Sequence, residues 1–380
     1  MIYADNAATT KISDLVFEKM LPFLRDEYGN ASSQYSLGMS ARRAVEQARR
    51  QVATAIGAQP AEITFNSGGS EGNCWVLCGL AAQFRNSPIH IISSCIEHPA
   101  VLNACRSLET SGVQITYLPV DKTGCVSVDD VELALRPNTK LVSIMFANNE
   151  IGTIQPICEI SKLLTNKGIL FHTDAVQAVG HIHIDVKELQ VDFLTASAHK
   201  FNGAKGTGFI YAKSASFLPP LIFGGEQEHG KRAGTENVAG IVATGVALEE
   251  NIAIMDDENE KKTILVNNTI SGLRAFIPDI IIGGENAVRL PGVINIIFPD
   301  ASGEAITRLL DLKGIYVSTS SACTSGKDEP SRVLLALGMS EKQAKSSIRI
   351  SYGRYNTPED AKEIVTAICS AYDKIAPTDK

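Results

Sequence analysis

Ser197-Ala198-His199-Lys200 is the most informative stretch of this sequence. It follows the apolar run 191–196 and precedes a glycine-broken turn over 203–208, after which a second strand-like run covers 209–212. The segment between two strands that are expected to be buried is an unusual place for a solvated lysine. Partial burial favours the neutral amine, which is the form that attacks a carbonyl carbon to make a Schiff base. A surface lysine in a loop is the ordinary alternative, and the residues upstream decide between the two.

An apolar strand that ends in an acid, Ile169-Leu170-Phe171-His172-Thr173-Asp174, lies ahead of the lysine. In α/β proteins, functional groups gather at the carboxyl ends of the sheet strands. Pyridoxal phosphate requires a carboxylate on its pyridine nitrogen, because the ion pair keeps that nitrogen protonated and makes the ring an electron sink. Asp174 is therefore a candidate partner for such a ring.

A phosphate cradle is predicted further upstream. Residues 62–65 form a predicted strand, Asn66-Ser67-Gly68-Gly69-Ser70 a turn, and the run from Cys74 a helix. The free amides and the positive end of a helix hold an anion, and Ser70 adds a hydroxyl group. A glycine-rich turn of this kind, taken alone, usually has no ligand. It indicates a phosphate site here only because Lys200 and Asp174 occur in the same sequence.

His98 follows the next predicted strand, 89–94, and comes directly before Pro99, which suits the first turn of a helix. The histidine is therefore expected at the same sheet edge, where a flat imidazole could stack on a flat cofactor. A capping or core histidine is the alternative.

Together these residues resemble the class V aminotransferase superfamily of fold-type I pyridoxal-phosphate enzymes, and within it the cysteine desulfurases of the iron–sulfur-assembly kind. The resemblance runs from Tyr3 to Ser351. Its most specific pieces are Asn148-Asn149-Glu150-Ile151-Gly152, Ser197-Ala198-His199-Lys200, Arg232-Ala233-Gly234-Thr235 and Ser321-Ala322-Cys323-Thr324-Ser325.

The resemblance implies that pyridoxal 5'-phosphate is the cofactor and that Lys200 binds it covalently. His98 would stack on its ring and shuttle protons, and Thr235 would reach its phosphate from the second subunit of a homodimer. The residues implied to bind the cofactor are Gly69, Ser70, His98, Asn149, Asp174, Gln177, Ser197, His199, Lys200 and Thr235.

The main substrate-binding residue and the residue that handles sulfur are assigned to the C-terminal part of the chain. The planar fork of Arg349 matches an α-carboxylate bidentately, with Arg354 as a rival, and the resemblance adds Asn149 and Asn30 as substrate contacts. Cys323 has small or polar neighbours, which predicts an exposed loop that suits a reactive thiolate. From the local sequence alone, an incidental thiol in a loop is an equally good interpretation of Cys323. The resemblance assigns this cysteine to catalysis.

The implied activity is removal of sulfur from L-cysteine, which gives L-alanine and a persulfide on Cys323. The acceptor of that sulfur stays open between a cluster scaffold, a tRNA-thiolation enzyme and another carrier. A selenocysteine or cystine lyase on the same cofactor frame is an alternative. A non-catalytic sulfur-carrier scaffold is another, and the presence of Lys200, Asp174 and Cys323 argues against it.

Strands of four to seven residues alternate with helical patterns from 62 to 212, which predicts an α/β fold with a mainly parallel sheet and helices on both faces. The resemblance implies fold type I, with a seven-stranded sheet in the large domain and a small α/β C-terminal domain. We expect an N-terminal arm that joins the small domain (1–20), a large cofactor-binding domain (21–259) and a small domain (260–380).

Composition limits the binding partners, the cellular location and the metal sites that the sequence predicts. The 380 residues carry a net charge of −7 with mixed signs, which argues against nucleic-acid and anionic-membrane partners. Eight scattered cysteines without a Cys-x-x-Cys pair, and no signal peptide or membrane-spanning run, predict a cytoplasmic protein without a metal site. His181, His183 and Asp185 could pass for metal ligands, but no further ligand cluster supports them. The arginines of the predicted helix 38–57 are expected on a solvated face.

Overall fold

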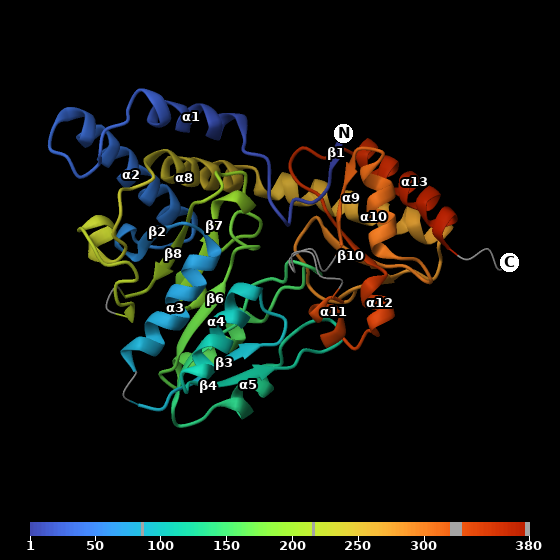
Figure 1. Cartoon of the computed structure of the whole chain (residues 1–380), viewed down its shortest axis with the longest axis horizontal. Helices are drawn as coiled ribbons and strands as arrows, with labels where there is room; N and C mark the ends of the chain where they lie inside the picture. The colour runs from blue at the N-terminus through green and yellow to red at the C-terminus, as the bar shows by residue number, and fades with distance from the viewer. Residues whose placement is uncertain (85–86, 215–216, 320–328, 377–380) are drawn as a thin grey trace.

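The computed structural model describes residues 1–84, 87–214, 217–319 and 329–376, so Cys323 lies outside the described residues. Two units, each built on its own sheet, lie beside each other in Figure 1. The N-terminal strand β1 (Ile2–Tyr3) lies in the second unit, where it pairs in parallel with β11 (Ile315–Tyr316).

The large unit has a seven-stranded sheet. Its strands, in spatial order, are β2 (Ile63–Asn66), β8 (Gly208–Ala212), β7 (Phe193–Ser197), β6 (Leu170–Asp174), β5 (Thr139–Ser143), β3 (His90–Ser94) and β4 (Gln114–Leu118). The pairs from β7 to β4 are parallel, whereas β8 runs antiparallel to both of its neighbours. Because a parallel crossover needs a dozen or more residues, the short connection 198–207 forces β8 to run in the reverse direction. The predicted α/β class and the mainly parallel seven-stranded sheet are thus confirmed.

Helices cover both faces of this sheet, as the sequence pattern predicts. The helices α2 (Ser36–Ala55), α6 (Ile157–Thr165) and α8 (Val238–Ala253) pack on one face, and α3 (Gly69–Gln83) and α4 (Pro99–Thr110) pack on the other. Successive residues of β7 show the alternation of a strand, since Phe193 packs towards α3 while Leu194 faces the opposite core. The remaining elements among the described residues of this unit are α1 (Asp14–Arg25), α5 (Val128–Ala134), α7 (Val186–Leu189) and the 3₁₀ turns η1 (Pro60–Glu62), η2 (Ala198–Lys200) and η4 (Gln227–Gly230).

The second unit has a four-stranded antiparallel sheet and a separate core. Its strand order is β12 (Ser318–Thr319), β13 (Ser347–Ser351), β10 (Val293–Ile297) and β9 (Ile281–Ile282). Its helices are α9 (Met255–Phe276), α10 (Gly303–Asp311), α11 (Arg332–Ala336), α12 (Glu341–Lys345) and α13 (Pro358–Ile375). Ile2 and Ala4 of the N-terminal arm belong to this core, while Val16 of α1 belongs to the core of the large unit. The expected boundaries after residues 20 and 259 both fall inside helices, α1 and α9, so the division of the chain stays a prediction.

Arg49 differs from the solvated arginine that the helix pattern predicts. Its side chain is buried, and its two terminal nitrogens bind both carboxylate oxygens of Glu228 at 2.8 Å. Glu228 also accepts a bond from the backbone N–H of Phe65 at 2.8 Å and adopts a left-handed backbone, with φ at 48°. The ion pair therefore ties η4 to β2 and α2. The other arginines of α2, residues 42, 43 and 50, are exposed as predicted.

No single described helix is both long and apolar enough to cross a membrane, and α8 and α9 reach that length and apolarity only as a pair bent by 72°.

Candidate active site

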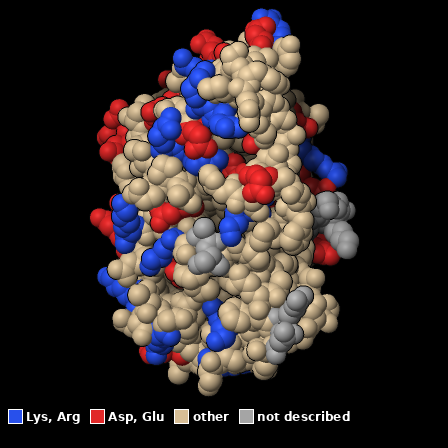
Figure 2. Space-filling model, turned by 90° about the vertical axis from the view of Figure 1, so that its left-hand side faces the viewer, with Lys and Arg blue, Asp and Glu red and all other residues tan. Residues whose placement is uncertain are grey.

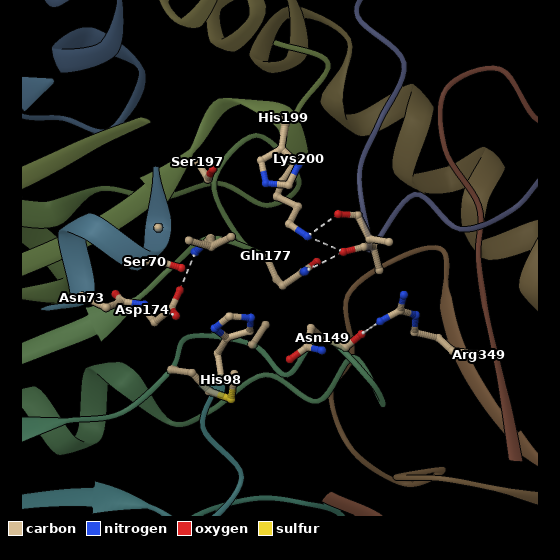
Figure 3. Close-up of a pocket in the computed structure, with 16 residues that line it drawn as sticks. Ser70, Asn73, His98, Asn149, Asp174, Gln177, Ser197, His199, Lys200 and Arg349 are labelled. Carbon is tan, nitrogen blue, oxygen red and sulfur yellow. Dashed lines mark hydrogen bonds between the residues drawn. The ribbon is translucent and has the colours of Figure 1, made fainter. Parts of the chain in front are cut away.

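Ten of the predicted site residues meet in a cavity of about 310 Å³ at the carboxyl ends of the large sheet (Figure 3). Most of them come from the end of a strand of the large sheet, or from the turn or helix that follows it, as is usual for open α/β sheets. Arg349 comes instead from β13 of the second unit. The predicted residues that line this cavity are Gly69, Ser70, His98, Asn149, Asp174, Gln177, Ser197, His199, Lys200 and Arg349.

The other predicted site residues are not brought to this cavity. Thr235 lines a neighbouring hollow together with Arg232 and Glu236. Asn30 lies in the loop between α1 and α2, where its side-chain oxygen accepts a bond from the backbone N–H of Ser32 at 2.9 Å. Cys323 is outside the described residues.

Lys200 ends the 3₁₀ turn η2, directly after β7, and its side chain points into the cavity (Figure 3). Its Nζ donates to the backbone oxygens of Ala7 at 2.6 Å and Ala8 at 2.7 Å. The backbone oxygen of Lys200 accepts a bond from Nε2 of His181 at 2.9 Å. Burial lowers the pKa of His181 to about 3, so this histidine is neutral and positions the lysine backbone. His183 instead contacts Asp256, so the two histidines of the possible metal motif have different partners.

Asp174 is the last residue of β6 and is almost fully buried. Its Oδ2 accepts a bond from Asn73 Nδ2 at 2.6 Å, and its Oδ1 accepts one from the backbone N–H of Val176 at 3.0 Å. Burial raises the pKa of Asp174, while His98 and the two hydrogen bonds act in the opposite direction. A cationic ring nitrogen beside this carboxylate would stabilise its charged form.

His98 caps α4, and its ring points into the cavity beside Asp174 (Figure 3). Its Nδ1 accepts a bond from the backbone N–H of Ala100 at 3.1 Å, so the proton of the neutral ring must lie on Nε2. Burial lowers the pKa of His98, an effect that Asp174 opposes. The cap therefore fixes both the direction and the tautomer of this ring.

The amino end of α3 forms the side of the cavity that is suited to an anion. Gly68 has a φ of 134°, and a Cβ atom on Gly69 would lie 2.6 Å from Cγ2 of Val176, so both positions require glycine. A second hollow of about 310 Å³ adjoins the cavity and shares residues with it, among them Ser70 and His199. Burial lowers the pKa of His199 to about 4, so the side chain is neutral at pH 7, and its Nδ1 lies 3.1 Å from Thr9 Oγ1.

Arg349 on β13 forms the opposite wall, and its side chain is only 3 % exposed. Its Nη2 lies 2.6 Å from Asp5 Oδ1, and its Nη1 donates to the backbone oxygen of Asn149 at 2.9 Å. The rival Arg354 is not among the lining residues and pairs with Glu250 at 2.8 Å.

Two residues that the sequence reasoning missed support the site. Asn73 holds Asp174 and lies one helical turn after Gly69, a spacing that could have identified it. Glu97 lies behind His98, where its Oε1 accepts bonds from Ser94 Oγ at 2.6 Å and from the backbone N–H of Met145 at 2.9 Å. Burial raises the pKa of Glu97 to about 8, so this carboxyl group is protonated at neutral pH and links β3 to the segment after β5.

The donor set fits pyridoxal phosphate. Lys200 supplies an amine, the buried Asp174 a carboxylate for a ring nitrogen, and the amino end of α3 an anion site. The cavity holds all three groups together with a neutral histidine that presents a flat face.

The fold and the site therefore define a pyridoxal-phosphate-dependent enzyme of fold type I. The aminotransferase class-V family model matches residues 2–364, and the chain belongs to this family.

Relatives within the family agree closely over almost the whole chain. A cysteine desulfurase IscS from Dictyoglomus turgidum is 49% identical over 359 residues, which cover 94% of this chain and 91% of the relative. A cysteine desulfurase IscS from Methanosarcina thermophila is 46% identical and covers 98% of this chain and 92% of its own length.

Solved structures agree with this assignment. A NifS-like protein superposes with a TM-score of 0.93 at 37% identity and covers 98% of this chain and 100% of its own. The structure described as SspA in complex with cysteine superposes with a TM-score of 0.80 at 34% identity and covers 94% of this chain and 100% of its own.

Proposed function

We propose that this protein is a cysteine desulfurase, which removes sulfur from L-cysteine and releases L-alanine. The observation that carries the proposal is the meeting of Lys200, Asp174 and His98 in one cavity with Arg349 on its opposite wall. The names of the relatives, and the cysteine bound to SspA, support the same substrate.

Each residue has a distinct task in this proposal. Bound pyridoxal phosphate supplies an electron sink that acidifies the α-carbon of the amino acid. Lys200 holds the cofactor and, once free, moves the α-proton. His98 holds a proton at Nε2 on the cavity side, and Arg349 binds the α-carboxylate. Asp174 balances positive charge at the inner end of the cavity.

Sulfur removal requires a nucleophile outside these residues, and Cys323 is proposed for it. The Cys323 thiolate attacks the sulfur of the substrate, and the bond between that sulfur and Cβ breaks. The electron pair of this bond stays on the carbon side, so protonation yields L-alanine and leaves a persulfide on Cys323. A second protein then accepts the sulfur, for cluster assembly or tRNA thiolation. A cytoplasmic location stays part of the proposal.

Turnover of L-cysteine tests this function directly. With a thiol reductant present, the protein loaded with cofactor is expected to release alanine and sulfide in equal amounts. Amino-acid analysis and a sulfide assay measure the two products. Turnover of selenocysteine without any turnover of cysteine would replace this proposal with a selenocysteine lyase, and absence of both activities would support the scaffold alternative.

A homodimer with shared active sites is the second part of the proposal. Thr235 lies outside the cavity of its own chain, in a hollow next to η4. Large apolar side chains are exposed in two segments of the large unit, since Tyr28 in the loop after α1 is 75% exposed and Phe223 ahead of η4 is 85% exposed. Both segments lie on the left of Figure 1, and Figure 2 shows that this side mixes acidic and basic residues between wide uncharged areas.

Light scattering is expected to give twice the chain mass of 40.7 kDa. Thr235→Val, which keeps the shape and removes the hydroxyl group, should weaken cofactor affinity by about tenfold, because one hydrogen bond to a charged phosphate is lost. Equilibrium dialysis measures that affinity. A monomer that keeps full cofactor content and activity would contradict the shared site.

A further inference from the structure

Residues 5–9 form a compact turn, here called the Asp5–Thr9 turn, which lies between the two units. The backbone oxygen of Asp5 accepts a bond from the N–H of Ala8 at 3.0 Å. The Tyr3 hydroxyl group lies 3.0 Å from the same oxygen and 2.8 Å from that of Thr9. These contacts close the turn, which also bonds to Ser351 through the backbone N–H groups of Asn6 and Ala7, so a shift of the Asp5 backbone would be passed on to Ala8.

The turn has one end on Arg349 and the other on Lys200. The Asp5 carboxylate lies 2.6 Å from Arg349 Nη2. The backbone oxygens of Ala7 and Ala8 accept bonds from Lys200 Nζ at 2.6 and 2.7 Å, as Figure 3 shows. Three residues of sequence therefore connect the proposed carboxylate site to the amine that acts on the substrate.

The fork of Arg349 is already occupied at both terminal nitrogens. Nη1 donates to Asn149, and Nη2 faces the Asp5 carboxylate. Nε is buried and has no hydrogen-bond partner within the described residues, so it is not open to a ligand in the cavity. A carboxylate that enters the cavity must therefore bind through the terminal nitrogens, and one of these already pairs with an acid of the same charge and shape.

We propose that Asp5 determines specificity for substrates with an α-carboxylate by competing for Arg349. This inference rests on the proposed function, because it takes the carboxylate that competes with Asp5 to be that of the amino-acid substrate. Displacement of Asp5 shifts the Asp5–Thr9 turn and withdraws the Ala7 and Ala8 oxygens from Lys200. Once the substrate has freed Lys200 from the cofactor, the displaced turn leaves its amine able to act, whereas with an amine that lacks a carboxylate the turn stays in place and holds it. Asp5 acts through Arg349 and Lys200 and is therefore a positioning residue.

Calorimetric titration of the cofactor-loaded protein tests the competition. Two probes each carry part of the structure of cysteine. 3-Mercaptopropionate has the thiol and the carboxylate, and cysteamine has the thiol and the amine. Asp5→Asn keeps an oxygen acceptor for Arg349 and removes the charge. The variant is expected to bind 3-mercaptopropionate roughly tenfold more tightly and cysteamine unchanged.

Two control variants show whether a change in affinity is specific to the pairing of Asp5 with Arg349. Asp14→Asn changes an exposed acid on α1 that pairs with Lys11 at 3.7 Å, and it should alter neither dissociation constant. Arg349→Gln should weaken binding of 3-mercaptopropionate alone. Unchanged or weaker binding of 3-mercaptopropionate by Asp5→Asn would overturn the competition, and so would an Arg349→Gln variant that binds this probe normally.

The movement of the turn is tested on the unaltered protein by hydrogen exchange with mass spectrometry. Saturating 3-mercaptopropionate should speed exchange of the amides of residues 5–9, and cysteamine should leave it unchanged. Equal exchange with and without 3-mercaptopropionate would refute the release of the turn. None of these measurements needs turnover, so their failure is distinguishable from a failure of the protein to desulfurate cysteine.

Discussion

Replacing Lys200 with alanine is expected to abolish desulfuration and to leave the cofactor removable by dialysis. The variant lacks the amine that we propose to bind the cofactor, and loss of the proton transfer proposed for it would alone cost about 10²- to 10⁴-fold in rate. Borohydride reduction followed by peptide mapping should place a pyridoxyl label on Lys200 in the unaltered protein and leave the corresponding peptide of the variant unlabelled.

Lys213→Ala is the matched control, because Lys213 is an exposed lysine that follows β8 outside the cavity. This variant should keep the yellow colour of bound pyridoxal phosphate, the label at Lys200 and the activity. A label on another lysine in the unaltered protein would refute the assignment, as would a colourless protein that pyridoxal phosphate does not reconstitute.

Replacing Cys323 with alanine should separate substrate binding from sulfur transfer. Lys200, Asp174 and Arg349 remain in this variant, so cysteine should still change the absorbance of the bound cofactor. Alanine has no thiolate to attack the sulfur, and production of alanine and sulfide should fall by orders of magnitude. Spectrophotometric titration with cysteine and a sulfide assay measure the two effects independently.

Cys105→Ala and Cys369→Ala are the controls for Cys323. Cys105 is fully buried on α4, and Cys369 is half-buried on α13 and packs against the core of the second unit. Both substitutions should lower the melting temperature and leave the chemistry in place. Normal desulfuration by Cys323→Ala would show that no persulfide on this residue is needed, and a direct elimination of the lyase kind would then describe the reaction better.

The mainly parallel sheet and the central residues of the cavity were predictable from local sequence, whereas Asn149, Gln177, Ser197 and His199 were assigned only through the family resemblance. The strand before Asp174 and the helix after Gly69 lie where the apolar runs and the glycine pair place them. The carboxyl ends of parallel strands meet at one edge, so strand-end residues far apart in sequence converge on one cavity. That convergence explains why Lys200, Asp174 and His98 could be grouped before their distances were known.

Contacts between distant segments were not predictable in the same way. Arg49 looks like one more basic residue on an amphipathic helix, and its burial depends on Glu228, which is remote in sequence. Likewise, nothing in the alanines of the N-terminal arm reveals that their backbone oxygens bind Lys200. Backbone acceptors carry no sequence signal, and a long-range ion pair requires the fold before its partner can be chosen.

The pairing of the N-terminal arm with the second unit has a consequence for biosynthesis. A ribosome releases Ala7 and Ala8 first and β13 almost last, and the arm is held by bonds to Ser351 and by the pairing of β1 with β11. Residues 69–200, which supply most of the cavity, emerge well before the strands that anchor the arm. The nascent chain can therefore assemble most of the cavity while Lys200 still lacks its carbonyl partners, and this proposed catalytic lysine gains its final surroundings only near the end of translation.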